Sequence, residues 1–190
     1  MAQRIRLAVL PDTVAVVPGG RLDLVLTLGN DGGVVDRYLI SVGGVPADWY
    51  DLETAAVALF PNDSTQVALT LHPPAGTTAG SYRIVVVAVS EDDPTVRVSV
   101  PIALVVNQVG AVSMTVLPPA ALGRTGAFRV TFHNGANAAA AMLLAVRDDQ
   151  EGLRFYREPP GPVVAPARGE ASVMVRVVPR VRKLLGAAHL

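Results

Sequence analysis

Short segments of this chain alternate apolar and polar residues with a period of two. Residues 21–28 place a leucine at every second position, and residues 65–71 repeat the alternation. Successive side chains on a strand point to opposite faces, so this pattern predicts strands with one buried face. Residues 81–89 are largely apolar on both faces, as a central strand would be. Clusters of Gly, Asn, Asp and Pro separate these segments and predict turns.

Seven strands are predicted in the first half of the chain. Their number and spacing are typical of an immunoglobulin-like β-sandwich, in which two antiparallel sheets enclose one core. The Cys-Trp-Cys set of antibody domains is missing, so the prediction is the general sandwich architecture. Trp49 is interpreted as an anchor that closes one end of the core. The predicted strands are 5–10 with its continuation 13–17, 21–28, 37–43, 54–59, 65–71, 81–89 and 95–106.

The second half of the sequence repeats the first. The segment around Asn30 matches the segment around Asn134 at an offset of 104, and residues 67–73 match 173–179 at an offset of 106. We expect the two asparagines at equivalent hairpin corners, where Asn can bond its own backbone and adopt a left-handed conformation. Self-similarity over this length predicts two homologous modules joined near residues 107–110. The predicted modules are residues 1–107 and 108–190.

The repeat register predicts that the second module lacks its last two strands. At an offset of 106, Gly80 falls on Gly186 and Ile84 falls on Leu190. Such a module would expose a strand edge and an unfilled part of its core, which natural proteins avoid. Two explanations stay open: a shortened chain, which we favour, and a strand supplied by a second chain. The predicted fold class is all-β, with two tandem Ig-like, fibronectin-like β-sandwich domains, the second without its last strands.

The amino-acid composition agrees with an all-β protein and excludes sites that depend on cysteine. Of the 190 residues, 51% are hydrophobic, and 17 Gly and 15 Pro supply turns between apolar runs. The chain has no Cys, which excludes disulfides, thiolate metal sites and a cysteine nucleophile. The longest apolar runs are far shorter than the roughly 20 residues of a membrane-spanning helix, so no membrane span is predicted. No secretory signal is recognised at the N-terminus, and a cytoplasmic location is expected.

Charge is divided unevenly, although the net charge is zero. Residues 1–107 carry six Arg against eleven Asp and Glu, near −5, and residues 108–190 carry ten Arg and Lys against five acids, near +5. We favour chance as the explanation over head-to-tail contact or an anionic partner. The basic C-terminal residues have no interleaved aromatics for base stacking, so nucleic acid is not an expected partner. They are kept as candidate interaction residues: Arg176, Arg180, Arg182 and Lys183.

The residue types that carry enzyme chemistry do not form a recognisable motif. His72, His133 and His189 each lack a carboxylate or second His at the close sequence spacing of a metal site or general base. Acidic clusters at 91–93 and 148–151 offer oxygen ligands to Ca²⁺, but neither is an EF-hand loop, and solvated turns are favoured. Phosphate loops and hydrolase motifs are missing. We therefore expect no enzymatic activity, no bound metal and no cofactor.

Several motifs of the first module resemble those of a bacterial family. The motifs are VDRY at 35–38, GVPADWY at 44–50, LFPND at 59–63 and LHPP at 71–74. Through them the chain resembles bacterial Ig-like modules related to the NPCBM-associated family, and in particular actinobacterial tandem-module proteins labelled "hydrolytic protein". The resemblance spans nearly the whole chain and is weaker in the second module. It implies a seven-stranded sandwich with an accessory or scaffold role, and it supplies no catalytic residues.

Together these features favour a non-enzymatic structural or protein-interaction module. We expect a spacer, adaptor or decoration component of a larger surface or injection-type assembly, with a protein partner or self-association. The alternative is a carbohydrate-binding accessory domain, a fold-level analogy. Aromatic residues are only 5% of the chain, although several are close together in the first module. The aromatic candidates for an interaction site are Tyr38, Trp49 and Tyr50.

Overall fold

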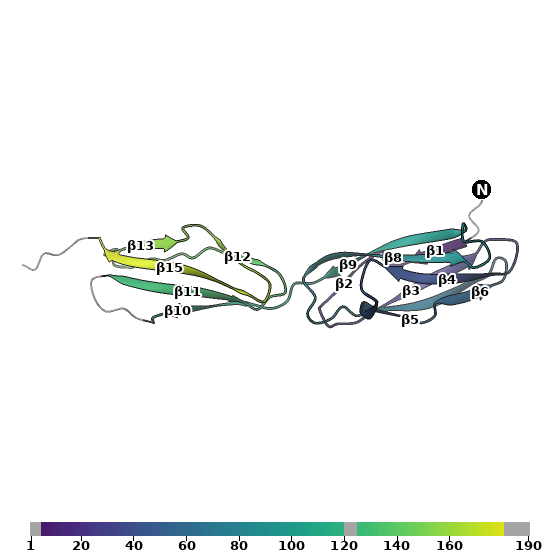
Figure 1. The fold of residues 1–190 in the computed structure, drawn as a ribbon, viewed down its shortest axis with the longest axis horizontal. Coiled ribbons are helices and arrows are strands. Elements are labelled where there is room, and N and C mark those ends of the chain that lie inside the picture. Colours follow the sequence, from purple (N-terminus) through teal and green to yellow (C-terminus); the bar gives the residue numbers. More distant parts are fainter. Residues whose placement is uncertain (1–4, 120–124, 181–190) are drawn as a thin grey trace, which may run out of the picture. The chain divides into compact units, whose positions relative to one another are not determined.

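The computed structural model describes residues 5–119 and 125–180 and divides into two compact units, Met1–Val109 and Gly110–Leu190 (Figure 1). Both units are built from strands, with a single 3₁₀ turn, η1, at Ala47–Trp49 among the described residues. The strands of the first unit are β1 (Ile5–Val9), β2 (Thr13–Val16), β3 (Leu22–Asn30), β4 (Asp36–Gly43), β5 (Tyr50–Leu52), β6 (Ala56–Leu59), β7 (Ser64–Leu71), β8 (Gly80–Ser90) and β9 (Arg97–Val106). Those of the second unit are β10 (Val112–Leu117), β11 (Gly126–Asn134), β12 (Ala140–Met142), β13 (Leu153–Glu158), β14 (Val163–Ala165) and β15 (Glu170–Pro179).

The first unit contains two sheets around one core. Their strand orders are β1-β3-β7-β5 and β2-β9-β8-β4-β6, with all pairs antiparallel except β2 and β9. The alternation of the sequence is the reason for this arrangement, because it places apolar side chains of each sheet on one face. Leu26 and Leu69 of one sheet and Ile84 and Ile102 of the other are each at most 1% exposed. The prediction of an all-β, sandwich-like protein is therefore confirmed.

The strands of the first unit follow the predicted segments closely, but there are nine of them instead of seven. The first predicted strand is divided between the sheets, because β1 pairs with β3 and β2 pairs with β9. The second difference is β5, which follows η1 and pairs with β7. Three residues with a central aspartate, Asp51, are too few to show a period of two. This strand was therefore not predicted.

The larger sheet of the second unit has the order β10-β11-β15-β13 and reproduces the sheet β1-β3-β7-β5. The pair Leu28↔Thr65 of β3 and β7 becomes Phe132↔Ala171 of β11 and β15, at the offsets of 104 and 106 seen in the sequence. The repeat register of the sequence is thus present in the strand pairing.

The smaller sheet of the second unit contains only β12 and β14 and corresponds to β4 and β6. Asp36↔Leu59 in the first unit becomes Ala140↔Ala165 in the second, again at offsets of 104 and 106. Within the described residues of this unit, no strand corresponds to β2, β8 or β9. Gly186 and Leu190 lie outside the described residues, so the register proposed for them stays a prediction.

None of the helical segments in residues 5–119 and 125–180 is long and apolar enough to cross a membrane.

Candidate interaction surface

Two buried asparagines hold the ends of the equivalent strands β3 and β11. Asn30 is 1% exposed, and its Oδ1 accepts a hydrogen bond from the Gly32 N–H at 2.9 Å. Its Nδ2 donates to the carbonyls of Val34 at 2.9 Å and Leu59 at 3.0 Å. One side chain therefore satisfies three main-chain groups at the point where the chain leaves one sheet for the other.

Asn134 repeats this arrangement. Its Oδ1 accepts from the Ala136 N–H at 3.0 Å, and its Nδ2 donates to the carbonyls of Ala138 at 2.8 Å and Ala165 at 3.2 Å. The predicted equivalence of the two asparagines is confirmed. The predicted hairpin corner is wrong, because each corner connects two different sheets. Neither Asn adopts the left-handed conformation that this residue tolerates. The side chain supplies the turn bonds, so the backbone needs no special conformation.

The inner face of β10 is open, whereas the inner face of its counterpart β1 is covered. Ile5, Leu7 and Val9 of β1 are 1%, 7% and 5% exposed, with β9 packed against the strand. The residues at the same register positions in β10 are directly opposite buried residues of β11. Their exposed fractions are 42% for Val112, 52% for Met114 and 38% for Val116.

The rest of the larger sheet in the second unit is partly covered. Phe132 of β11 and Val173 and Val175 of β15 are buried at 8%, 2% and 3% exposure. Met142 and Val163 of the small sheet pack against this cluster. The small sheet therefore closes one side of the core and leaves the side along β10 uncovered in the described residues.

A second opening follows β12. In the first unit, β4 pairs with β6 on one edge and with β8 on the other. Among the described residues, β12 pairs with β14 alone, and residues 143–147, the counterparts of 39–43, are not part of a strand. A cavity of about 720 Å³ adjoins this segment. Its lining includes Leu143, Val146, Phe155, Arg157 and Arg180.

Arg157 distinguishes this core from that of the first unit. It is on the inner face of β13, opposite Val175, at the position that Leu52 occupies in β5. Its guanidinium donates to the main-chain carbonyl of Leu144 in the segment after β12. A half-buried arginine thus holds that segment, whereas the first unit has the apolar Leu52 at the equivalent position.

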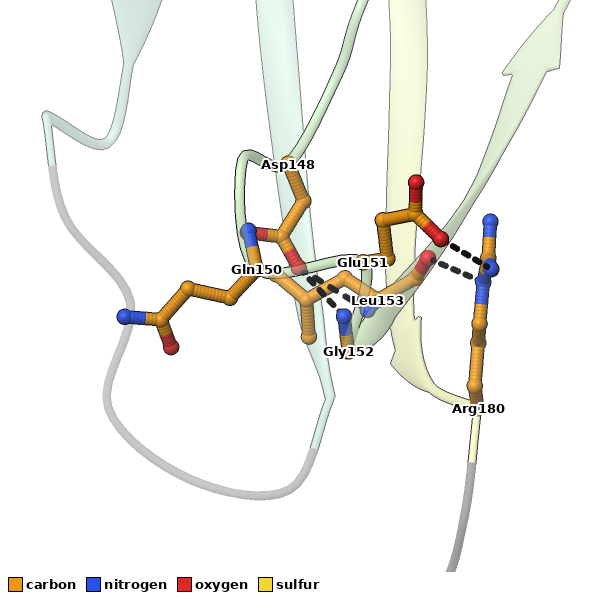
Figure 2. Close-up of polar contacts among 6 residues, drawn as sticks. All are labelled: Asp148, Gln150, Glu151, Gly152, Leu153 and Arg180. Atoms are coloured by element: carbon orange, nitrogen blue, oxygen red, sulfur yellow. Dashed lines mark hydrogen bonds and ion pairs between the residues drawn. The ribbon is translucent and has the colours of Figure 1, made fainter.

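The acidic cluster at 148–151 forms a turn (Figure 2). Among the described residues, no group of three or more His, Asp or Glu side chains is arranged to hold a metal ion. Asp148 accepts hydrogen bonds from the N–H groups of Gln150 at 3.2 Å, Gly152 at 2.8 Å and Leu153 at 3.0 Å. The cluster at 91–93 is used in the same way, because Asp93 accepts from the N–H and hydroxyl of Thr95. One carboxylate of each cluster, that of Asp148 or Asp93, is therefore hydrogen-bonded within its own loop.

Of the four predicted basic contact residues, two lie among the described residues. Arg180 extends over the Asp148 turn, with its Nε donating to the Leu153 carbonyl at 3.1 Å and its Nη1 3.7 Å from the Glu151 carboxylate (Figure 2). Arg176 is exposed on the outer face of β15. Arg182 and Lys183 lie outside the described residues. Two of the four residues are therefore observed, Arg176 on β15 and Arg180 at the Asp148 turn, and their role as contact residues stays a prediction.

The three aromatic candidates belong to the core of the first unit instead of forming an exposed row. Tyr38 is 0% exposed, and burial, together with nearby Asp36, raises its pKa to about 12. Trp49 is half-buried and meets Tyr82 edge to face at 5.0 Å, as expected for an anchor at the end of the core. The half-buried Tyr50 donates its hydroxyl to the Val42 carbonyl at 3.2 Å.

Two histidines have carboxylate neighbours that the sequence spacing did not reveal. His133 Nδ1 is 2.7 Å from Glu170 Oε1, and its Nε2 is 3.0 Å from Thr115 Oγ1. His72 Nε2 is 3.1 Å from Asp51 Oδ2. These partners come from neighbouring strands, which a search along the sequence cannot place together. Cross-strand pairing of exposed side chains accounts for the His133 contacts; His189 lies outside the described residues.

Comparison with known proteins gives only distant likenesses. No protein-family model and no curated protein matches the chain. A Porphyromonas gingivalis W83 protein of unknown function is 14% identical, with a TM-score of 0.42 over 91% of this chain and 83% of that one. The Pseudomonas aeruginosa CupB2 chaperone is 9% identical, with a TM-score of 0.40 over 87% of each chain. PapD-like domain 7 of human CEP192 is 15% identical, with a TM-score of 0.40 over 57% of this chain and 87% of that one.

Proposed function

We propose that this chain is a non-enzymatic protein-interaction module that acts as a spacer or adaptor in a larger assembly. The open inner face of β10 carries the proposal. Val112, Met114 and Val116 expose an apolar strip on the edge strand of the larger sheet, whereas the equivalent strip of the first unit is buried. Apolar strips beside free strand edges are surfaces at which other polypeptides bind.

The same observations support a finer description of the architecture. We propose two tandem Ig-like domains, at residues 1–107 and 108–190, of which the second has no counterpart of β8 or β9 in its described residues. The shared register of the two four-stranded sheets supports their homology. Under this proposal the first domain is the rigid, self-contained part of the molecule, and the second domain provides the binding surface. The related modules are those of the NPCBM-associated family, whose implied accessory role agrees with this division.

Site-specific photo-crosslinking in cells of the source organism tests the function. A benzophenone amino acid replaces Met114 on the inner face of the sheet or, as a matched control, Met174 on its outer face. Both methionines are exposed, at 52% and 40%, in the same sheet. We expect discrete protein adducts from position 114 and few from position 174. Adducts that are equally frequent at both positions, or missing at 114, would contradict the proposed interaction role.

A further inference from the structure

A line of outward arginines crosses the larger sheet of the second unit diagonally. Arg129 of β11 is opposite Met174 of β15, and Arg154 of β13 is opposite Val178 of β15. Arg176 lies between these two levels and on the same face of the sheet, because outward residues of a strand recur with a period of two. Diagonal neighbours on adjacent strands are about 7–8 Å apart. The three arginines therefore form a line of regularly spaced cations, which we call the arginine diagonal.

The arginine diagonal has no counter-ion within the described part of the protein. All three of its side chains belong to exposed residues. None of the ion pairs in residues 5–119 and 125–180 includes them. The other residues of the chain, 1–4, 120–124 and 181–190, contain no Asp or Glu that could neutralise them. Three cations at a repeated spacing match a linear polyanion better than a single small anion.

A hollow of about 350 Å³ adjoins Arg176, the central residue of the arginine diagonal. Tyr156 is directly opposite Arg176 on β13 and is 55% exposed. Ala127, opposite Arg176 on β11, has a small side chain that leaves space at this place. The lining also includes Glu158 and Met174. The hollow thus combines an aromatic ring, an apolar side chain and a carboxylate acceptor next to a cation.

This combination of groups matches a nucleotide. Guanidinium groups bind phosphate oxygens through paired hydrogen bonds, and exposed aromatic rings stack with bases. A base carries no net charge, and its amino group can donate to Glu158, as the amino group of cytosine does to acidic side chains. A polymer or membrane surface with anionic groups throughout would instead place negative charge against that carboxylate. The distribution of charge therefore favours a ligand in which anionic groups and neutral rings alternate.

We propose that the outward face of β11, β15 and β13 binds single-stranded nucleic acid, with phosphates along the arginine diagonal and a base against Tyr156. A single strand is required, because the bases of a duplex are held inside its stack. The expectation against nucleic acid rested on the lack of aromatics among the basic residues in the sequence. Strand pairing places Tyr156 beside Arg176, which sequence spacing does not show. This site goes beyond the proposed protein-binding surface, since Met114 is on the opposite face of the sheet.

Fluorescence anisotropy of a labelled oligodeoxycytidylate, titrated with the full chain at several salt concentrations, tests the proposal. Three phosphate contacts predict that the logarithm of the binding constant falls with the logarithm of salt concentration at a slope of about −2, or about −0.7 for each contact. Arg176→Gln should reduce this slope by about 0.7 and weaken binding about threefold or more. Arg147→Gln removes an exposed cation elsewhere in the same unit and should change the affinity less than about twofold.

Tyr156 gives a second readout that is independent of charge. Tyr156→Ala removes the stacking surface and should weaken binding about fivefold or more, with the salt slope unchanged because no cation is lost. Tyr156→Phe keeps the ring and should retain the affinity within about twofold. Circular dichroism checks the fold of each variant, which we expect to be kept because all the substituted residues are exposed.

Several results would contradict the proposal. The oligonucleotide does not bind at low salt, or Arg176→Gln and Arg147→Gln have equal effects. Heparin binds as tightly as the oligonucleotide and Tyr156→Ala has no effect, which would indicate a general polyanion site. A duplex of the same length binds more tightly than the single strand. Light scattering shows self-association that Arg176→Gln abolishes, which would make the acidic residues of a second copy the occupant.

Each of these results overturns the nucleic-acid site and leaves the proposed protein interaction untouched. That interaction is measured separately, by the protein adducts formed at position 114. Adducts at 114 without oligonucleotide binding would therefore refute this inference alone, and oligonucleotide binding without adducts would refute the protein interaction alone.

Discussion

Replacing Asn30 with Ala should destabilise the first unit strongly, although the residue is at the end of its strand. The Asn30 side chain is 1% exposed and makes three hydrogen bonds to main-chain groups, with Gly32, Val34 and Leu59. Alanine removes all three bonds and leaves the Leu59 carbonyl without this buried donor. A polar group that loses its partner in the interior carries the cost of its desolvation.

The size of the effect follows from those bonds. At about 1 kcal/mol for each bond, the free energy of unfolding should fall by about 3 kcal/mol. For a unit of this size, that loss lowers the melting temperature by roughly 12–24 °C. Asn30→Asp should lower the free energy of unfolding at least as much at neutral pH. Its carboxylate still accepts the hydrogen bond from Gly32, but it places a negatively charged oxygen next to the carbonyl oxygens of Val34 and Leu59.

Trp49 makes the measurement specific to the first unit, because it is the only tryptophan of the chain and is half-buried in that unit. Urea unfolding followed by Trp49 fluorescence therefore reports this unit alone. Asn134→Ala is the matched control: it removes the equivalent bonds in the other unit and should leave the Trp49 transition in place. A loss below about 1 kcal/mol in Asn30→Ala, or an equal shift in Asn134→Ala, would refute the reasoning.

Three further predictions use the same unfolding assays. The pKa of Tyr38 is raised to about 12, so the stability that its protonated hydroxyl contributes is fully present below pH 10 and is lost as the pH rises toward 12. The free energy of unfolding should fall by up to about 3 kcal/mol over that range, and Tyr38→Phe should remove this part of the pH dependence. Gly44→Ala should lower the free energy of unfolding by about 3 kcal/mol or more, because φ at Gly44 is +94° and an added Cβ would be 2.1 Å from a carbonyl oxygen of β8. At Gly43 an added Cβ meets open space, so Gly43→Ala should lower it by less than about 1 kcal/mol. Leu7→Gln should lower the free energy of unfolding by more than about 3 kcal/mol, whereas Met114→Gln, at the equivalent open position of the second unit, should lower it by less than about 1 kcal/mol. Unfolding of the second unit is followed by circular dichroism. Equal losses in the two variants would show that β10 is covered.

Alternation in the sequence predicted most strands of the first unit, because a strand between core and solvent has one physical requirement at every second residue. Alternation failed to predict a strand that is too short to show a period, and it failed to show which sheet each strand joins. The three-residue strand β5 has too few positions to show a period, and the split between β1 and β2 depends on which sheet each one joins. Sheet membership is a long-range property that local periodicity does not contain.

The candidate residues show the same limit more sharply. Tyr38 was predicted as a contact residue from its aromatic neighbours in sequence, but an alternating strand places every second residue inside, and Tyr38 is one of them. The residues of the open strip, Val112, Met114 and Val116, were not singled out, because an apolar strand face gives no sign of whether another sheet covers it. Only comparison of the two units, position by position, reveals the difference.

That comparison also shows that the four-stranded sheets of the two units are built alike. The units differ in the strands that cover this sheet. The four-stranded sheets keep the same strand order and register, and the corner asparagines keep the same bonds. If the second unit had a fold of its own, its pairing would have no reason to follow offsets of 104 and 106. The inner positions of β10 would also have no reason to be apolar. A sheet built to the same plan but left open on one side is explained most simply as a surface that a further strand layer completes.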